Sequence, residues 1–349
     1  MSGKRCANDT CAYNRANSSA PCYHADGCTD YKEAPARAPL LTVAICAYNA
    51  QDTIAETLRS LALQTCMDFE LVVVEDGENA EQHSIICEAL AEIPVKAIGH
   101  VHHDNFGIGH ARNTALSLVR TPYVSFLDAD DLLMPHAVET LTEACKADCD
   151  VVVGKTMREA PDGRFEIVGI ESATWLHGRA YKLDLLREYE IVFPNIRMSE
   201  DLGFNACVEE FADRDKIAQT YTPIHIQRWR MGSLSRRDVV SGELSSETYM
   251  YALEHYLHTI RANDVEYVSA KVLPGFLAGA FYRIYNTKDA ERRHYLIGLM
   301  RETCADVMRS GIMSDPDFRW RLGKEMAKGF LAYATDPDSM VNLFKWVVV

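Results

Sequence analysis

The chain contains no apolar run long enough to cross a membrane. None of its runs approaches the roughly 18 apolar residues that a spanning helix needs. The first residues lack the apolar core of a signal peptide and are instead polar and rich in cysteine. We therefore expect a cytoplasmic protein, with peripheral attachment at the inner face of the cell membrane as an alternative.

Positive charge is also scarce. The 36 Lys and Arg residues are outnumbered by 50 Asp and Glu residues, which gives a formal net charge of −14. Because an acidic chain binds phosphate backbones poorly, we do not expect nucleic acid as a partner. A single nucleotide needs only local positive groups or a metal ion, so the charge balance leaves a nucleotide ligand open.

Two common nucleotide-binding signatures are missing. No Gly-x-Gly-x-x-Gly follows the first predicted strand, which disfavours a dehydrogenase, and no Walker A sequence is present. The length of 349 residues is sufficient for one large α/β domain and a smaller helical one.

Eleven cysteines are present, and seven of them are scattered along the chain. The scattered ones are Cys46, Cys66, Cys87, Cys145, Cys149, Cys207 and Cys304. We expect them to be small core residues in a reducing compartment. The other four follow a C-x4-C-x10-C-x5-C pattern in a polar segment, at Cys6, Cys11, Cys22 and Cys28. Four thiolates there could hold a structural Zn²⁺; unpaired thiols and two disulfides are the alternatives.

From Leu41 onwards, short apolar runs alternate with segments of helical periodicity. The predicted strands are Leu41–Cys46, Phe69–Val74, Val95–His100, Tyr123–Leu127 and Asp150–Gly154, and the predicted helices are 52–65, 81–92, Gly107–Val119 and one that begins at Pro135. This alternation predicts an α/β fold with a Rossmann-like, mostly parallel sheet and helices on both faces. Helical segments at about 251–260, 265–285 and 289–310 predict a C-terminal helical region.

Three regions follow from this pattern. Residues 1–38 form a Cys-rich N-terminal segment, 39–240 an α/β domain, and 241–349 a helical region for acceptor contact or homo-oligomerisation. Ligands of parallel sheets bind outside the carboxyl ends of the strands. The polar residues at those ends are Tyr48, Asn49, Glu75, Asp76, Asp128, Asp130 and Asp131.

The densest acidic cluster is Asp128-Ala129-Asp130-Asp131, directly after a buried strand. Three carboxylates so close together repel one another unless a cation lies between them. Hard oxygen ligands suit Mg²⁺ or Mn²⁺, which would offset the charge of a diphosphate leaving group. The alternative is a solvated turn that caps the helix from Pro135.

Several segments, in their order along the chain, resemble family 2 of the inverting glycosyltransferases, which have the GT-A fold. They are Thr42–Asn49, Gln64-Thr65 with Phe69–Gly77, Asn105–Gly107 with Ala111–Asn113, Phe126–Asp131 as the Asp-x-Asp motif, and Ser199–Asp201. The resemblance covers about 42–235. The chain departs from the family at Glu75, where Asp is commoner, and at Cys46-Ala47, where proline is frequent.

The resemblance implies a nucleotide site. Its residues would be Ala47, Tyr48, Asn49, Asp76, Asn105, Gly109, Arg112, Asp128 and Ala129. In such enzymes Tyr48 would pack near the uracil ring, Asp76 would accept the imino N–H of the base, and Arg112 would contact the nucleotide. Alternatively, Tyr48 is an ordinary loop residue, Asp76 forms an Asx turn and Arg112 makes a surface salt bridge.

Metal binding and catalysis follow from the same resemblance. Asp130 would be the direct metal ligand, Asp128 would orient the ribose or a metal-bound water, and His225 is a further candidate ligand. Asp201 would be the catalytic base that takes the acceptor proton in a single displacement. Its alternative role is in a cap at the start of the following helix.

Two further segments have a predicted role. Met231-Gly232-Ser233 is surrounded by Arg228, Arg230, Arg236 and Arg237. We interpret this basic segment as a lid over the diphosphate, with a solvated basic loop as the alternative. Trp175 and His177-Gly178 would line the donor-sugar or acceptor pocket.

We therefore predict an inverting, metal-assisted transferase that moves a sugar from a nucleotide-sugar, expected to be a UDP-sugar, to a hydroxyl of a glycan or lipid-linked glycan. One alternative is a sugar-nucleotide nucleotidyltransferase. Ala47–Ala50 disfavours it, because that class carries a Gly-rich basic loop there. Another is a non-catalytic binding module, which the presence of Asp128, Asp130 and Asp201 disfavours.

Overall fold

The structure is a computed structural model that describes residues 38–168, 176–230, 243–329 and 344. Within these residues the chain forms two compact units, one of 38–168, 176–186 and 213–229 and one of 187–212, 230, 243–329 and 344. The predicted boundary at 240 and the four N-terminal cysteines lie outside the described residues. The predicted start of the α/β domain at residue 39 stays a prediction.

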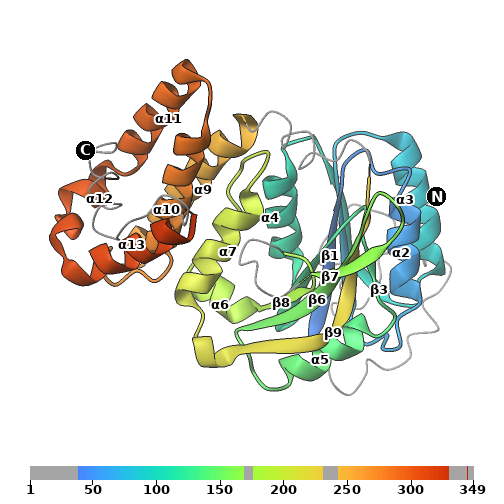
Figure 1. The fold of residues 1–349 in the computed structure, drawn as a ribbon. Helices are drawn as coiled ribbons and strands as arrows, with labels where there is room; N and C mark the ends of the chain where they lie inside the picture. Colours follow the sequence, from blue (N-terminus) through green and yellow to red (C-terminus); the bar gives the residue numbers. More distant parts are fainter. Residues whose placement is uncertain (1–37, 169–175, 231–242, 330–343, 345–349) are drawn as a thin grey trace, which may run out of the picture. The chain divides into compact units, whose positions relative to one another are not determined.

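The first unit has the predicted α/β fold, and its sheet combines the predicted parallel strands with antiparallel ones that were not predicted (Figure 1). Its described strands are β1 (Leu41–Ala47), β2 (Glu70–Asp76), β3 (Lys96–His103), β4 (Tyr123–Asp128), β5 (Leu132–Leu133), β6 (Val151–Glu159), β7 (Phe165–Val168), β8 (Arg179–Lys182) and β9 (Ile217–Gln227). The order is β3-β2-β1-β4-β8-β6-β9-β5, with β7 paired to β6. The first four strands are parallel, and β8 runs antiparallel to both of its neighbours.

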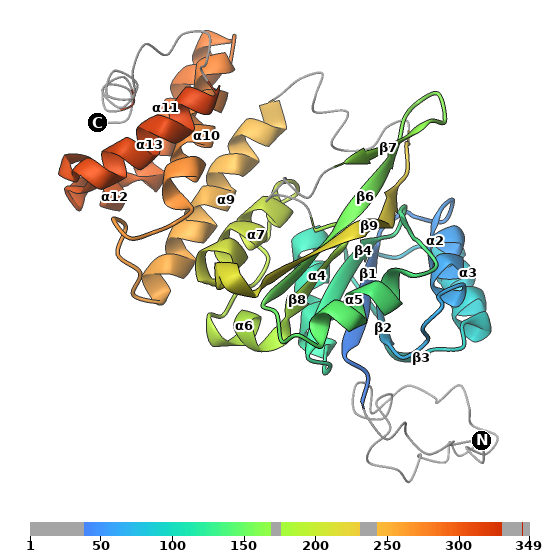
Figure 2. The same cartoon turned by 60° about the horizontal axis from the view of Figure 1, so that its bottom comes forward.

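Helices cover both faces of this sheet (Figures 1 and 2). They are α2 (Ile54–Ala62), α3 (Ala80–Glu92), α4 (Ile108–Leu118) and α5 (Ala137–Cys145), with α6 (Leu183–Glu188) and the short η1 (Arg214–Lys216) further along the chain. Successive residues of a strand point to opposite faces. Val43 and Ile45 therefore share one core with Leu58 of α2, while the buried Ala111 and Ala115 of α4 pack on the other face of β1 and β2.

Three parallel strands end at the same edge of the sheet. Cys46, near the end of β1, pairs with Val74 of β2 on one side and with Asp128 of β4 on the other. This register brings the segments after Ala47, Asp76 and Asp128 to one edge. The predicted convergence of strand ends is therefore confirmed.

The second unit is helical. Its described elements are α7 (Glu200–Phe211), α9 (Glu243–Ala262), α10 (Leu273–Asn286), α11 (Ala290–Thr303), α12 (Ala305–Arg309), η2 (Ile312–Ser314) and α13 (Pro316–Gly329). Two predicted boundaries were wrong. The helix expected from 265 begins only at Leu273, where Pro274 suits a first turn, and the helix expected over 289–310 is divided at Cys304 into α11 and α12. None of the described helices is both long and apolar enough to cross a bilayer.

A buried carboxylate joins three segments of the second unit. Glu210 of α7 accepts a hydrogen bond from the Tyr256 hydroxyl at 2.7 Å and from the backbone N–H groups of Lys271 and Val272, both at 2.9 Å. Burial and the neighbouring Glu210 raise the pKa of Tyr256, so its hydroxyl stays a donor. Glu210 thus binds α9 and the residues before α10 to α7.

We expect Glu210→Ala to lower the free energy of unfolding by about 3 kcal/mol, because it leaves buried donors without an acceptor. The adjacent Glu209 is exposed, so Glu209→Ala should change stability by less than about 0.5 kcal/mol. Urea denaturation of both variants measures the difference. Equal stability of the two variants would show that the hydrogen bonds of Glu210 do not stabilise the second unit.

Candidate active site

The end of β2 is fixed by Asp76. Its two carboxylate oxygens accept the backbone N–H groups of Phe106 at 2.9 Å and Gly107 at 3.0 Å, and His103 Nδ1 lies 3.4 Å from Oδ1. Oδ2 accepts one backbone N–H and keeps a second acceptor position, which a base N–H could use. Contact of Asp76 with the nucleotide base stays a prediction.

Gly77 allows two predicted nucleotide contacts to approach this carboxylate. Its φ of +116° is one that side chains rarely adopt, and an added Cβ would lie 3.3 Å from the Tyr48 ring and 3.2 Å from Asn105. Tyr48 is 56% exposed, so a ligand can reach it. Asn49 has a positive φ of 48°, and its side-chain oxygen accepts a hydrogen bond from Asn79 at 3.1 Å.

Glu75 does not join this site, although its position beside Asp76 suggested that it would. Neighbouring strand residues face opposite ways. Asp76 is held by the loop before α4, whereas Glu75 contacts Gln82 and His83 of α3 and His100 of β3. The Glu75 backbone therefore lies at the predicted strand end, but its side chain faces away from Asp76 and the other carboxylates there.

The buried Arg112 of α4 forms an ion pair with the partly buried Asp128. Its Nη2 lies 2.7 Å from Asp128 Oδ1, and only 5% of the residue is exposed. Burial is the largest effect and would raise the pKa of Asp128, but the charges of Arg112, His177 and His225 and the Arg112 hydrogen bond together outweigh it, so the pKa is lowered. α4 begins after Gly107, whose φ is +97°, and Gly109 is buried in its first turn. Contact of Arg112 with the nucleotide stays a prediction.

The acidic cluster forms a tight turn that α2 holds in place. Asp131 N–H donates to Asp128 O at 3.1 Å. The carbonyl of Ala129 accepts the hydroxyls of Thr53 at 2.9 Å and Thr57 at 3.0 Å. Carboxylate oxygens of Asp128, Asp130 and Asp131 lie within 4.8 Å of one another. The turn is therefore a preformed group of hard oxygen ligands.

Asp131 is the buried member of this cluster. Its Oδ1 accepts the backbone N–H of Arg228 at 3.0 Å, and its Oδ2 lies 3.2 Å from His225 Nε2 and 3.7 Å from His177 Nδ1. Burial raises the pKa of Asp131 to about 7, with Asp128 adding to the effect and His177 and Arg228 opposing it.

His225 is brought to the turn by strand pairing. β5 lies directly after Asp131, and Leu133 of β5 pairs with His225 of β9. The His225 ring is fully buried and stacks on His177, with centroids 4.8 Å apart and planes at 12°. Burial lowers the pKa of His225 to about 4. Neither of its ring nitrogens has a hydrogen-bond partner among the described residues.

These donors fit a divalent cation. Asp131, His177 and His225 form a second candidate ligand group that shares Asp131 with the acidic turn. Carboxylate oxygens with a neutral imidazole suit Mn²⁺ and related divalent ions. From the sequence, His177 was expected to line a sugar pocket, and its stacking on His225 was missed. Nothing in the sequence indicated that the Gly178 carbonyl accepts the Gly154 N–H at 2.8 Å.

Arg228, predicted as part of the diphosphate lid, contacts the acidic turn, and its role in a lid stays a prediction. Its Nε donates to Asp130 O at 2.8 Å, and its guanidinium pairs with Glu56 of α2. The remaining lid residues 231–237, together with Trp175, lie outside the described residues.

Asp201 belongs to the second unit, in the first turn of α7. The residue before the helix, Ser199, has a positive φ of 65° and makes no side-chain cap hydrogen bond to α7. Its hydroxyl lies 3.2 Å from Thr248 Oγ1 instead. Ser199 thus makes no side-chain cap, but the Asp201 carboxylate accepts the backbone N–H of Leu202 at 2.7 Å in the first turn of α7. The role of Asp201 as a base stays a prediction.

Comparison with known proteins agrees with this geometry. Residues 42–198 match the model of the family described as Glycosyl transferase family 2. The chain is 30% identical over 303 residues to the protein named Uncharacterized glycosyltransferase YibD of Escherichia coli (strain K12), covering 78% of this chain and 85% of that protein. It is 40% identical over 99 residues to a teichoic acid poly(glycerol phosphate) polymerase of Staphylococcus epidermidis, of whose length it spans 14%.

The solved structures include a similar fold. The crystal structure of S. aureus TarS residues 1–349 with UDP-GlcNAc has a TM-score of 0.61 and 19% sequence identity, covering 88% of this chain and 90% of that one. The chain therefore belongs to glycosyltransferase family 2 and is a glycosyltransferase with the GT-A fold, as the sequence predicted.

We expect Arg112→Gln to destabilise the first unit by about 2 kcal/mol, because it leaves Asp128 partly buried without its cation; the 31% exposure of the Asp128 side chain reduces the usual cost. In an Asp128→Asn background the same change should cost less than about 1 kcal/mol. Urea denaturation of the four proteins gives this double-mutant cycle. Strict additivity would contradict the coupling.

Proposed function

We propose that this glycosyltransferase moves a sugar from a UDP-sugar to a hydroxyl of a growing polysaccharide by single displacement, with inversion at the anomeric carbon. The observation that carries the proposal is the preformed acidic turn, in which Asp128 and Asp130 lie at the carboxyl edge of the sheet beside the buried Arg112. UDP-GlcNAc bound to TarS and the polymerase named above support the donor and acceptor classes.

The donor would bind along the edge of the sheet. The exposed Tyr48 ring would pack on the uracil, Asp76 would accept the imino N–H with a remaining lone pair, and Asn105 lies against the same glycine. Asp128, held by Arg112, would orient the ribose. These side chains are already hydrogen-bonded or packed, so binding would cost little ordering entropy.

Asp130 and Asp128 would hold Mn²⁺ or Mg²⁺, with the buried His225 as a further ligand. The bound ion supplies positive charge that offsets the charge of the departing diphosphate. Asp131 shares its carboxylate with the backbone N–H of Arg228, so it would position the turn.

Asp201 would take the proton of the acceptor hydroxyl while the C–O bond to the diphosphate breaks on the opposite face of the sugar. The left-handed backbone at Ser199 sets the start of α7, and such strain is common at functional sites. Peripheral membrane attachment, homo-oligomerisation through the C-terminal helices and zinc at the N-terminal cysteines remain separate predictions.

We expect Asp130→Ala to lower UDP release from a panel of UDP-sugars at least about 100-fold with Mn²⁺ present, because the diphosphate charge is no longer offset. UDP binding, measured by calorimetry, should weaken as well. Asp68 is exposed at a loop before β2, so Asp68→Ala removes the same charge and should leave both quantities unchanged. Equal UDP affinity in the wild type and Asp130→Ala, with and without metal, would count against the site.

Asp201→Asn should separate binding from chemistry. The amide cannot take the acceptor proton, so transfer should fall at least about 100-fold, while the UDP dissociation constant should stay within about twofold of the wild type. Single-turnover transfer and UDP calorimetry on the same preparation provide the comparison. Transfer at the wild-type rate would remove Asp201 from the mechanism.

A further inference from the structure

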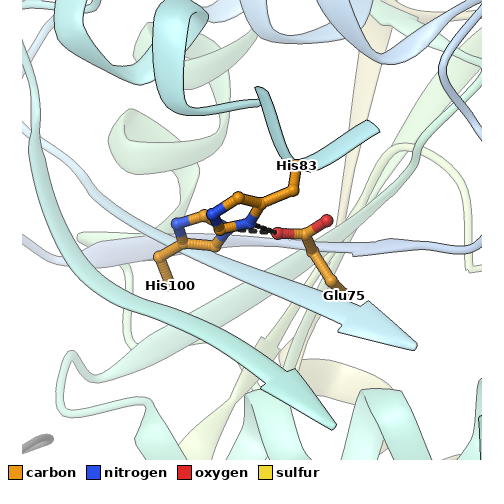
Figure 3. A group of neighbouring side chains, drawn as sticks. All are labelled: Glu75, His83 and His100. Carbon is orange, nitrogen blue, oxygen red and sulfur yellow. Dashed lines mark hydrogen bonds and ion pairs between the residues drawn. The ribbon is translucent and has the colours of Figure 1, made fainter. Parts of the chain in front are cut away.

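A second group of metal-ligating side chains lies on the side of β2 that faces α3. Glu75 comes from the end of β2, His83 from the first turns of α3 and His100 from β3 (Figure 3). His83 Nδ1 and His100 Nε2 each lie 2.7 Å from the same oxygen, Glu75 Oε1. The two imidazole rings stack, with centroids 5.3 Å apart and planes at 20°.

We propose that Glu75, His83 and His100 form a Zn²⁺ site, with water as the fourth ligand. Their three ligand atoms lie within 4.8 Å of one another. Two imidazoles and one carboxylate are a ligand set that Zn²⁺ takes in tetrahedral sites that keep one open position. Imidazole nitrogen also favours Zn²⁺ over Mg²⁺, which prefers oxygen ligands.

The carboxylate is oriented for this role by a fixed amide. The side-chain oxygen of Gln82 accepts the backbone N–H of Ala50 at 2.8 Å. This contact forces the NH₂ group of Gln82 toward Glu75, where it donates to Oε2 at 3.0 Å. One carboxylate oxygen is thus held by Gln82, and the other points at the two histidines. Such outer contacts orient the ligands of metal sites.

His83 has a comparable outer contact and an open approach. The Sγ of Cys87, one helical turn further along α3, lies 3.6 Å from His83 Nε2. Without a metal, Nδ1 would carry the proton that Glu75 accepts; with a metal bound, the proton would lie on Nε2, directed to this sulfur, and the Nδ1 lone pair would bind the ion. The His83 side chain is 54% exposed, so an ion can reach the site from solvent.

The charge of the site also calls for a cation. Glu75 is fully buried. Its two oxygens are held by Gln82 and the two histidines. A divalent ion bound by Oε1 and the two imidazoles would place positive charge directly beside this buried carboxylate.

This zinc site is separate from the nucleotide site. Glu75 pairs across the sheet with Ala47, and the adjacent Cys46 pairs with Asp128. β1 therefore lies between the two carboxylates, which places their backbones about 10 Å apart. Their side chains also contact opposite faces, α3 in one case and α4 in the other. The proposal does not depend on the proposed transferase reaction. Zn²⁺ bound here would tie β2, β3 and α3 together beside Asp76.

The test is a pair of substitutions that keep the hydrogen bonds but remove the metal ligands. The Asn amide nitrogen can take the place of His Nδ1, and the Gln amide nitrogen that of His Nε2. We expect His83→Asn/His100→Gln to fold like the wild type but to bind about one zinc ion fewer per chain after equilibration with Zn²⁺ and desalting. Elemental analysis of the full chain measures this number. The tail cysteines are present in both proteins, so the difference reports this site alone.

Two further measurements make the result decisive. His294 of α11 is exposed, so His294→Gln is a matched control and should keep the full zinc content. Adding Co²⁺ to the wild type should produce the visible absorption of a four-coordinate Co²⁺–imidazole site. This band should be weaker in the single variant His83→Asn. Because the His83 side chain is half-exposed, this variant is expected to fold even if the double variant does not. Equal zinc content and equal Co²⁺ absorption in the wild type and His83→Asn would overturn the proposal and leave a hydrogen-bonded triad only.

Discussion

Negative charge collects where the parallel strands of this protein end, and each carboxylate there needs a positive or hydrogen-bonding partner. Asp76 is satisfied by backbone N–H groups, Asp128 by Arg112, and Glu75 by two histidines and an amide. Carboxylates in a low-dielectric edge are costly without such contacts. The loops and helices around the edge are arranged so that these partners reach them, and the site is preformed as a result.

The alternation of side chains along β2 divides this edge into two faces. Asp76 contacts the loop before α4, while the adjacent Glu75 contacts α3. One face holds the carboxylate proposed to contact the nucleotide, and the other holds the group proposed to bind zinc. Two neighbouring acidic residues in the sequence therefore have unrelated surroundings in the fold.

Much of the fold could be predicted from the sequence because it depends on local patterns. The parallel strands from Leu41 to Asp128 and their intervening helices have the apolar periodicity that such elements require. The acidic turn was predicted as well, because Asp128, Asp130 and Asp131 follow a strand directly. The short β5 and the long β9 were not predicted. Their pairing is what brings His225 to Asp131, and two residues 94 positions apart leave no local signal of their contact. The division of the helical segment at Cys304 was missed for a similar reason, since apolar periodicity continues on both sides of it.

The pairing of β2 between β1 and β3 has a consequence for how this strand can vary. Because successive side chains face opposite ways, a single substitution in β2 acts mainly on one face of the sheet. Insertion or loss of one residue before Glu75 would instead rotate the whole strand end by half a turn. Glu75 would then face α4 and Asp76 would face the histidines. A single insertion or deletion would thus remove the contacts of both carboxylates. A change in the number of residues in β2 would therefore be more damaging than most single substitutions in it, because it would displace Glu75 and Asp76 together.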